Sequence, residues 1–570
     1  LGGAEAGGAG GRECNEGVMP SIDTVTLENY ESAFAGRHRI ADALDYWAGR
    51  KPAAPAVVNA TRGSVLTYAE LAGMTRALAG HLQRLGYRKG DFLATSLPLL
   101  NEHIVLEYAC FRAGVIHVPL DLRLAPAEVL RCLGLVQAKG FVHLGKTPTV
   151  DFSALGAAVK QHCPWVEHCW DAGEAMGVFQ EALRSPSAFE DTVDEHEGAQ
   201  VIFTTGSTGA PKPALLSHRG ITAQNLGLGT AFGFGPDQRV LVNLPASHVG
   251  CQSELLMTTL FLGGTAVTLE IFDAGLTLTA LERDKVTLLG QIPAMFQLLW
   301  RQPGYDGRDL SSLQTAVYGG QSVPRPFLEK MRTMAPRIGT GLGLTEASGF
   351  CTYTPATGDV DEVARSIGHA APIYPMTIRE AMKGDGRAGA EVAAGTVGHV
   401  CFKGPQTFLG YVNDEAATRQ TISSDGWLYT GDLGRVDGDG LHFAGRAKWV
   451  IKPAGNQVFP GEVEEYIGRL SEQVASVGVV GAEHAIWSEA IVAFVEKKPG
   501  ATITDVDLRR HARGLTSYMR PRHYVLLEPG EMPLNRVAKV DALKLSEMAR
   551  EEVRKLRERG RWDGETEDEV

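Results

Sequence analysis

The chain has 570 residues, 44% of them hydrophobic, which is enough for two or three packed domains and excludes a small scaffold that needs disulfides or metals. Its 55 basic and 67 acidic residues give a formal net charge of -12, which argues against general affinity for nucleic acid or for an anionic membrane. Eight cysteines without a CxxC pair indicate a reducing, cytoplasmic location.

Residues 1–19 are a Gly- and Ala-rich leader that we expect to be disordered, because it lacks the apolar core of a signal peptide. We expect no membrane anchor. The most apolar uncharged run, Leu255 to Leu269, is interrupted by two glycines and is shorter than the ~20 residues that span a bilayer.

Residues 20–446 are predicted to form a large N-terminal α/β domain. The helical pattern of Tyr68 to Leu85 is followed by short apolar runs over Phe92 to Leu97 and Val115 to Pro119. Apolar runs that alternate with helices predict parallel sheets buried on both faces, in stacked layers. A second series of such runs covers Ala199 to Thr204, Arg239 to Leu244, Thr265 to Leu269, Thr287 to Gln291 and Thr315 to Tyr318.

The pattern changes near residue 395, where short Gly-rich and aromatic strands predict a β-rich subdomain over about 395–446. Residues 447–550 are predicted to form a small α+β C-terminal domain. Its elements are a helix over Gly461 to Leu470, strands over Val474 to Val480 and Ala490 to Glu496, and a helix over Asp505 to Gly514. We interpret residues 551–570 as a charged tail, a solvated helix that frays because it lacks a sustained apolar face.

A glycine- and hydroxyl-rich loop, TTGSTGAPKPALLSH, follows one of the predicted strands and begins at Thr204. Such a loop can bind phosphate, since several N–H groups converge on the anion and no Cβ obstructs its approach. It is not a Walker loop, because the GxxxxGK[ST] pattern is absent. A tight structural turn is the alternative interpretation of this segment alone.

Further motifs follow in a fixed order. They are LPASHVG from Leu244, YGGQSVP from Tyr318, LGLTE from Leu342, YTGDLG, GRAKWVIKPAGNQVFPGEVE and PLNRVAKVDALKL. With these motifs the chain, from about Ile40 to Leu545, resembles the adenylate-forming superfamily of acyl-CoA synthetases, peptide-synthetase adenylation domains and firefly luciferase. It is also similar to the diterpenoid acyl-CoA ligases of platensimycin- and platencin-type pathways.

The resemblance implies a two-step reaction. A carboxylic acid attacks the α-phosphate of ATP with the help of Mg²⁺, giving an acyl-adenylate and pyrophosphate, and a thiol then displaces AMP. No acidic residue lies in Pro245 to Gly250, where amino-acid-activating members carry one, which argues against an α-amino acid. The simplest thiol is coenzyme A. Small residues near the acyl segment are compatible with a bulky hydrophobic acid, which we predict, and equally with close backbone packing.

The resemblance also implies roles for individual residues on the nucleotide side. Asp432 would accept both ribose hydroxyls, Thr345 would donate to the α-phosphate, and Glu346 would hold the metal. The implied nucleotide-binding residues are Thr204, Thr205, Gly206, Ser207, Thr208, Gly209, Lys212, Gly320, Gly343, Asp432 and Arg446.

On the acyl and thiol side, Lys539 would bridge the carboxylate and the phosphate during adenylation, and His248 would separate the acyl pocket from the thiol tunnel. Lys448 matches the hinge about which a mobile C-terminal domain rotates, and Gly455 would lie along the coenzyme A tunnel. The implied acyl pocket consists of His248, Val249, Gly250, Tyr318, Gly319 and Gly349.

Four positions depart from the family pattern. Pro213 stands where glycine is usual, Leu342 replaces an aromatic that stacks on adenine, Trp449 replaces an acid, and Ala538 replaces a glycine. We therefore hypothesise that adenylation is weak or lost, and that the enzyme mainly converts an acyl-adenylate, made by a separate ligase upstream, into its coenzyme A thioester. The alternatives are an ordinary two-step synthetase, an adenylation enzyme that loads a carrier protein, and a non-catalytic homologue that binds acyl groups or nucleotides.

Overall fold

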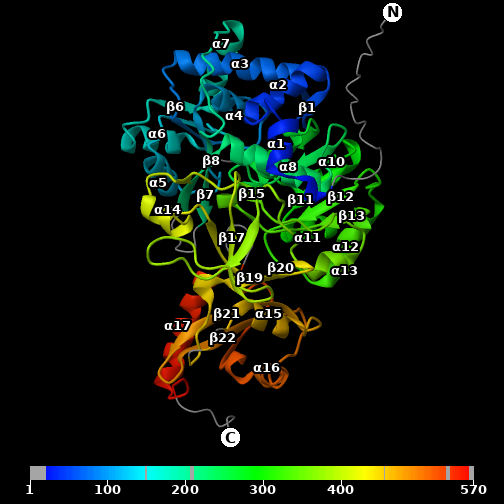
Figure 1. Ribbon diagram of the computed structural model, residues 1–570, viewed down its shortest axis with the longest axis vertical. Helices are drawn as coiled ribbons and strands as arrows, with labels where there is room; N and C mark the ends of the chain where they lie inside the picture. Colours follow the sequence, from blue (N-terminus) through cyan, green and yellow to red (C-terminus); the bar gives the residue numbers. More distant parts are fainter. Residues whose placement is uncertain are drawn as a thin grey trace, which may run out of the picture.

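The computed structural model describes residues 21–147, 151–205, 211–454, 456, 458–534 and 540–563. The leader predicted over residues 1–19 lies outside these ranges. The fold is α/β, as the sequence predicts, with a large N-terminal domain above a small C-terminal domain in the view of Figure 1. No helix within the described ranges has the length and apolarity needed to cross a membrane.

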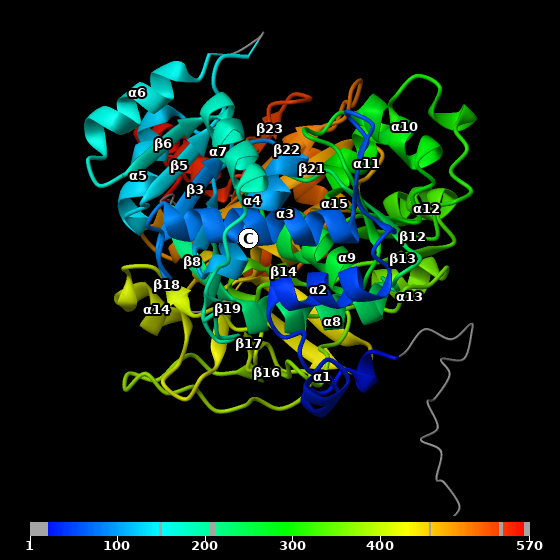
Figure 2. The same ribbon diagram turned by 90° about the horizontal axis from the view of Figure 1, so that it is seen from above.

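Two seven-stranded sheets form the large domain, and they lie on opposite sides of the molecule in Figure 2. Most neighbouring strands are parallel, because helices return the chain between them, as the alternating pattern predicts. The first sheet has the order β13 (Arg337–Gly339), β12 (Thr315–Tyr318), β11 (Leu288–Gln291), β9 (Arg239–Val242), β10 (Thr265–Thr268), β1 (Pro55–Asn59) and β2 (Ser64–Thr67).

The second sheet carries the phosphate-loop candidate. Its order is β18 (Gly410–Tyr411), β8 (Pro211–Ser217), β7 (Gly198–Thr205), β4 (Ile116–Pro119), β3 (Phe92–Ser96), β5 (Gly140–His143) and β6 (His168–Asp171). The pairs β7–β8 and β8–β18 are antiparallel, so this edge of the sheet departs from the parallel pattern. The sequence interpretation did not include that antiparallel edge.

Helices α4 (Asn101–Ala113) and α8 (His218–Phe232) fill the layer between the two sheets, and nearly all of their residues are buried. The apolar core of this layer takes side chains from both sheets, for example Val57 and Ile202. Helix α3 (Tyr68–Arg84) packs beside α4 and begins with a capping box between Thr67 and Glu70. The helices around this layer are α2 (Ile40–Arg50), α7 (Ala172–Arg184) and α9 (Thr258–Phe261).

Further helices cover the outer faces of the two sheets. Because side chains alternate along a strand, Val57 faces the central layer while Val58 faces the outer core beneath α10–α12. The outer helices are α10 (Ala274–Arg283), α11 (Pro293–Trp300), α12 (Arg325–Met334) and α13 (Val360–Arg365) on one sheet, and α5 (Pro126–Val136) and α6 (Ser153–His162) on the other.

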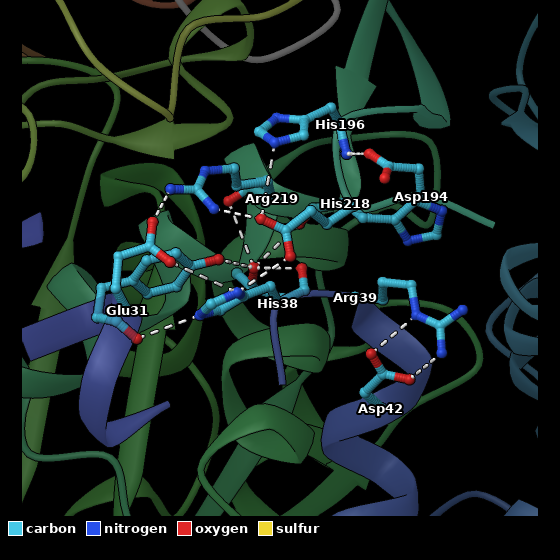
Figure 3. A network of polar contacts seen from close by, with 11 residues as sticks. Glu31, His38, Arg39, Asp42, Asp194, His196, His218 and Arg219 are labelled. Carbon is cyan, nitrogen blue, oxygen red and sulfur yellow. Dashed lines mark hydrogen bonds and ion pairs between the residues drawn. The ribbon is translucent and has the colours of Figure 1, made fainter. Parts of the chain in front are cut away.

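A polar network fastens helix α1 (Leu27–Ala33) to the start of α8 (Figure 3). Arg219 pairs with both Glu31 and Glu195, and Nδ1 of His38 lies 3.0 Å from a carboxylate oxygen of Glu195. Arg39 forms a two-pronged ion pair with Asp42 at 2.6 and 2.8 Å. The network fixes the N-terminus of α8, whose inner residues lie behind the candidate site.

The β-rich subdomain is an antiparallel sheet of β16 (Met376–Arg379), β17 (Gly398–Phe402), β19 (Leu428–Asp437) and β20 (Gly440–Arg446), with α14 (Glu415–Thr421) nearby. The C-terminal domain is built on β21 (Val474–His484), β22 (Ser488–Lys497) and β23 (His523–Leu527), with α15 (Pro460–Gly468) and α16 (Asp505–Ala512) on one face. Phe459 packs on Leu433 and Ala444, joining the two parts.

The end of the chain differs from the sequence interpretation of a solvated tail. Helix α17 (Ala542–Glu558) buries Leu545, Ala549 and Val553, which recur every four residues and so form one apolar stripe. Trp562 is 1% exposed, and its indole N–H donates to the carbonyl of Glu483 at 2.8 Å. The helix and Trp562 therefore pack on the C-terminal domain through these buried side chains, and the charged residues occupy the outer face of the helix.

Candidate active site

The phosphate-loop candidate connects two antiparallel strands. Strand β7 ends at Thr205 and β8 begins at Pro211, and Thr204 pairs with Lys212 across the two strands. Thr204 and Lys212 therefore point to the same face of the sheet. The residues between the strands, Gly206, Ser207, Thr208 and Gly209, lie outside the described residues, and their roles stay predictions.

Pro213 is part of strand β8 and not of the loop. It pairs with Phe203 of β7, and its carbonyl accepts a hydrogen bond from the N–H of Val412 at 2.9 Å. The N–H and C=O of one strand residue point to the same side, so the missing N–H faces the short edge strand β18. The missing donor therefore belongs to the edge of the sheet, and Pro213 gives no structural support to the hypothesis that adenylation is weak or lost.

Glu346 is held by a tyrosine that the sequence analysis did not identify. The hydroxyl of Tyr411 donates to Oε1 of Glu346 at 2.6 Å, and Nζ of Lys212 lies 5.1 Å from the centre of the Tyr411 ring. Burial, followed by the charge of Glu346, raises the pKa of Tyr411 far above its usual range. Tyr411 therefore stays protonated and remains a donor to Glu346.

Asp432 and Arg446 form a pair on neighbouring strands. They are cross-strand partners in β19 and β20, and Nε of Arg446 lies 2.8 Å from Oδ1 of Asp432. The Asp432 side chain is 3% exposed, whereas the Arg446 side chain is 51% exposed. A buried carboxylate held by one guanidinium keeps a fixed position, and the exposed side of the guanidinium can meet an anion.

Lys448 lies close to two other cations. It follows Arg446 in a short 3₁₀ turn, Ala447–Trp449, and its Nζ lies 4.5 Å from the centre of the Trp449 ring. Burial, followed by the positive charges of Arg446 and Lys212, lowers the pKa of Lys448. The positive charges of Lys212, at the start of β8, and of Arg446 therefore act on the predicted hinge residue.

Thr345 and Glu346 lie in a 3₁₀ turn, Thr345–Ala347, that follows the short strand β14 (Gly343–Leu344). The turn ends at Ser348, whose φ of 59° is left-handed and rare for a residue with a side chain. Two hydrogen bonds hold Ser348 in place: its hydroxyl donates to the carbonyl of Gln406 at 3.0 Å, and the Ser253 hydroxyl donates to its carbonyl at 2.6 Å. The residues expected at the phosphate and metal therefore stand on a rigid turn.

The predicted acyl segment leads into a π-helix, Gly250–Met257. His248 is exposed, and its Nδ1 accepts from the N–H of Gly250 at 3.0 Å, whereas Val249 is buried in the central core. π-Helical turns are rare and occur often at functional sites. The side chain of His248 therefore lies at the surface, and the buried side chain of Val249 holds the segment in the central core.

The two turns after β12 and β14 face the same central core. A Cβ at Gly319 would lie 3.0 Å from Cζ of Phe350, and Gly349 has a φ of +131° that disfavours other residues. Gly320 is exposed and left-handed, with a φ of +97°. Tyr318 is different: its ring packs against Phe327 in the outer core, 6.0 Å between centres. Because successive side chains of a strand point to opposite faces, the Tyr318 ring points away from the predicted acyl pocket, and only the backbone of Tyr318 lies near that pocket.

Besides the loop residues, three further predicted positions fall outside the described residues: Lys539, Gly455 and Ala538. One functional candidate, Tyr411, was not predicted at all. Tyr411 lies in a GYVND segment with no charge pattern to mark it, and only the pairing of β18 with β8 brings it to Lys212.

Glu346 suits a magnesium ion. Mg²⁺ binds carboxylate oxygens together with substrate phosphates and keeps several waters. The described residues contain no group of three or more His, Cys, Asp or Glu side chains that could hold a metal alone, so most remaining ligands would be phosphate oxygens and water. When bound, the ion would offset negative charge on the phosphates.

The sequence of the chain is similar to those of known families and proteins. Residues 44–412 match the model of the AMP-binding enzyme family, and residues 462–539 match that of the AMP-binding enzyme C-terminal domain. A feruloyl-CoA synthase of an Amycolatopsis species is 31% identical over 464 residues, covering 81% of this chain and 89% of the relative. An indoleacetate–CoA ligase of Aromatoleum aromaticum is 30% identical over 505 residues, covering 87% and 95%.

Among solved structures, ATP-bound MatB from Rhodopseudomonas palustris superposes with a TM-score of 0.77 at 24% identity. The superposition covers 90% of this chain and 98% of that chain, so the likeness includes both domains. At this identity it concerns the fold alone.

Proposed function

The chain belongs to the AMP-binding enzyme family, among its acyl-CoA ligases, and from this premise we propose that it joins a bulky hydrophobic carboxylic acid to coenzyme A through an acyl-adenylate. In the first step a carboxylate oxygen bonds to the α-phosphorus of ATP and pyrophosphate leaves. In the second step the thiolate sulfur of coenzyme A bonds to the acyl carbon, and the bond to AMP breaks.

The observation that supports this proposal is a set of three cations, Lys212, Arg446 and Lys448. Arg446 is fixed by Asp432 at 2.8 Å, and Lys448 follows Arg446 by two residues in a short 3₁₀ turn. Burial, followed by the positive charges of Arg446 and Lys212, lowers the pKa of Lys448. Cations held close to one another before the substrate arrives favour a polyanion, because their geometry needs no rearrangement when it binds. A nucleoside triphosphate, with its adjacent phosphates, fits such a cluster.

We assign the remaining roles as part of the proposal. Asp432, fixed by Arg446, would accept the ribose hydroxyls, and Thr345 would donate to the α-phosphate at the rigid turn. Glu346 would hold Mg²⁺ with Tyr411 behind it. Lys539 would bridge the two reacting anions in the first step.

The C-terminal domain would rotate about Lys448 between the two steps. Gly455 would then come to the coenzyme A tunnel, and the exposed His248 would stand between that tunnel and the acyl group. The small apolar cluster formed by Phe459, Leu433 and Ala444 supports a movable junction, because few buried residues join the domains.

The bulky acid is supported by the relatives and not by free space at the glycines, because a Cβ at Gly319 or Gly349 would lie 3.0 Å from Phe350 or 2.9 Å from Glu254. The two relatives above are named for ring-bearing acids, feruloyl and indoleacetate, which favours a ring-bearing acid here. A diterpenoid acid of the platensimycin type belongs to the same proposal.

A second candidate function is that the enzyme mainly forms thioesters. In this case adenylation is slower than thioester formation, and a separate ligase supplies the acyl-adenylate. Leu342 favours it, because a half-buried aliphatic side chain replaces the stacking partner of adenine. Pro213 no longer supports it, because it lies in a strand.

Purified protein, ATP, Mg²⁺, coenzyme A and a panel of ring-bearing acids labelled with ¹⁸O in the carboxyl group test the proposal. The expected products are a CoA thioester and AMP that carries one ¹⁸O, since the acid oxygen stays on phosphorus. Label-free AMP would contradict an acyl-adenylate. Acylation of a carrier protein in place of coenzyme A would favour the carrier-loading alternative.

A further inference from the structure

The tip of the β21–β22 hairpin is closed by His484, the last residue of β21. Nδ1 of His484 accepts hydrogen bonds from the N–H groups of Ile486 and Trp487 at 3.1 and 3.2 Å. The turn ends at Ser488, whose φ of 62° is left-handed and rare for a residue with a side chain. The hydrogen bonds of His484 therefore help to hold a turn that ends on a strained residue.

The same ring joins the tip to the segment that follows helix α17, which packs beside β21 (Figure 1). Its Nε2–H donates to the carbonyl of Trp562 at 2.8 Å, and the N–H of Ala485 donates to the Asp563 carboxylate at 3.0 Å. One ring nitrogen faces a carbonyl and the other faces two N–H groups, so these bonds require the neutral imidazole with its proton on Nε2. Burial, followed by the charge of Arg522, lowers the pKa of His484, which favours that neutral form.

The tip of the hairpin in turn supports residues 452–454. The N–H of Ala454 donates to the carbonyl of Trp487 at 2.7 Å, and the N–H of Lys452 donates to the carboxylate of Glu489 at 2.6 Å. Ala454 has a φ of 48°, which is also left-handed. A residue with a side chain keeps such a backbone conformation only where its surroundings hold it. The hairpin therefore fixes the path of this short segment.

This segment lies where the second step of the reaction needs a fixed backbone. It follows the proposed hinge, Lys448, and Ala454 directly precedes Gly455, which the proposed function assigns to the coenzyme A tunnel. The backbone that meets the thiol arm has to be in place before the thiol arrives, because a small misplacement costs rate. The first step makes no such demand, since the domain rotates only after adenylation.

We propose that His484 is a positioning residue for the coenzyme A step: it ties the hairpin tip to the segment after α17 and so holds the backbone of residues 452–454 for thiol entry. This inference rests on the proposed function and adds a residue of the C-terminal domain to its second step. His484 is 2% exposed, so it acts through the hairpin and not by contact with substrate. Loss of its hydrogen bonds slows thioester formation and leaves the nucleotide site unchanged.

The test compares the two half-reactions in His484→Ala. Thioester formation is followed with synthetic 3-phenylpropanoyl-, feruloyl- or indoleacetyl-adenylate, whichever the wild type consumes fastest, and with varied coenzyme A. The kcat/KM for coenzyme A should fall roughly 5- to 20-fold, because the hydrogen bonds that hold the tip are lost. Pyrophosphate release from ATP with the same acid, and AMP affinity measured by calorimetry, should stay within about twofold of wild type, because the nucleotide site is on another domain.

Two further variants and a control separate positioning from folding. His484→Asn is the rescue variant, because an asparagine side chain accepts from the N–H two residues on, as in an Asx turn, and it should recover part of the lost kcat/KM. Glu489→Ala removes the acceptor of the Lys452 N–H and should slow the same step about 2- to 5-fold. His511→Ala is the matched control, since His511 also donates from Nε2 to a backbone carbonyl, at 2.9 Å, but lies on α16.

The outcomes distinguish this inference from the function on which it rests. Circular dichroism and thermal unfolding establish which variants are folded, and His484→Asn and Glu489→Ala decide the question if His484→Ala is not. Equal losses in both half-reactions, or wild-type coenzyme A kinetics in the folded variants, overturn the positioning role while thioester formation still stands. Absence of any thioester from folded wild-type protein with all three adenylates overturns the proposed function, and the inference falls with it.

Discussion

The hydroxyl of Tyr411 donates a 2.6 Å hydrogen bond to Oε1 of Glu346, across 65 residues of sequence. Because Glu346 is the proposed metal ligand, this bond orients the carboxylate toward the phosphates. Tyr411→Phe removes the donor and keeps the ring above Lys212. We expect kcat/KM of the ATP-dependent reaction to fall roughly 10- to 100-fold, and the Mg²⁺ concentration for half-maximal rate to rise.

The same variant should leave the reaction of acyl-adenylate with coenzyme A within about twofold of wild type, because no triphosphate takes part in it. Equal losses in both half-reactions would show that Tyr411 has a general structural role and does not position the metal ligand.

Asp432→Asn tests the ribose site. The substitution preserves volume but removes the charge that fixes Arg446, so AMP affinity should weaken at least about tenfold, as measured by calorimetry. Asp437→Asn on the same strand is the matched control, because Asp437 pairs with Arg435 and His442 away from Arg446. Similar AMP affinities for the two variants would exclude Asp432 from the nucleotide site.

The contact of Lys448 with Trp449 predicts a small effect on ATP binding. Trp449→Ala removes the ring that holds the ammonium near Arg446 and Lys212, so the KM for ATP should rise about 2- to 5-fold, in line with a cation–π contact of about 0.5–1 kcal/mol. Trp449→Phe keeps a ring, so its KM for ATP should lie between those of the wild type and of Trp449→Ala. A lower KM in Trp449→Ala would mean that the ring restrains Lys448 from binding phosphate.

Pro213 and Leu342, grouped together by their departure from the family pattern, should behave differently. Pro213→Gly should leave the KM for ATP unchanged and reduce stability by about 1 kcal/mol, because glycine in a strand adds unfolded-state entropy. Leu342→Tyr should lower the KM for ATP about fivefold through stacking worth about 1 kcal/mol. Pyrophosphate release and urea unfolding measure the two effects. A large gain in adenylation rate from Pro213→Gly alone would show that this position does affect phosphate binding.

Trp562 tests the corrected end of the chain. Trp562→Ala should destabilise the C-terminal domain by about 3–5 kcal/mol, because it removes a large side chain that is 1% exposed. Removal of residues 564–570, beyond the described ranges, is the comparison. Denaturant unfolding followed by tryptophan fluorescence should show one transition at a lower denaturant concentration in Trp562→Ala than in the wild type. An unchanged unfolding curve would support the interpretation of the chain end as a solvated tail.

Much of the fold could be predicted because its elements carry strong local signals. The strands of the large domain are short apolar runs between helices, and the structure confirms β3, β9, β10, β11 and β12 within a residue or two of their predicted bounds. The helix after residue 542 was underestimated, since its charged face hides a buried stripe at four-residue spacing.

The site was less predictable, because its geometry depends on long-range pairing. Pro213 pairs with a residue 10 positions earlier in the chain, and Tyr411 pairs with a residue about 200 positions earlier. A local sequence pattern therefore predicts neither the place of Pro213 in the sheet nor the contact of Tyr411 with Lys212. Tyr318 was assigned by its motif, but strand alternation turns its ring to the opposite face. Motifs located the turns, and the structure was needed to show where the side chains point.

The most direct test of the central claim is the rate of thioester formation from a ring-bearing acyl-adenylate and coenzyme A, followed by chromatography under single-turnover conditions. The account predicts one CoA thioester and one AMP per adenylate consumed, at a rate that depends on coenzyme A concentration and saturates. Hydrolysis to free acid and AMP at the same rate with and without coenzyme A, across the acid panel, would contradict it.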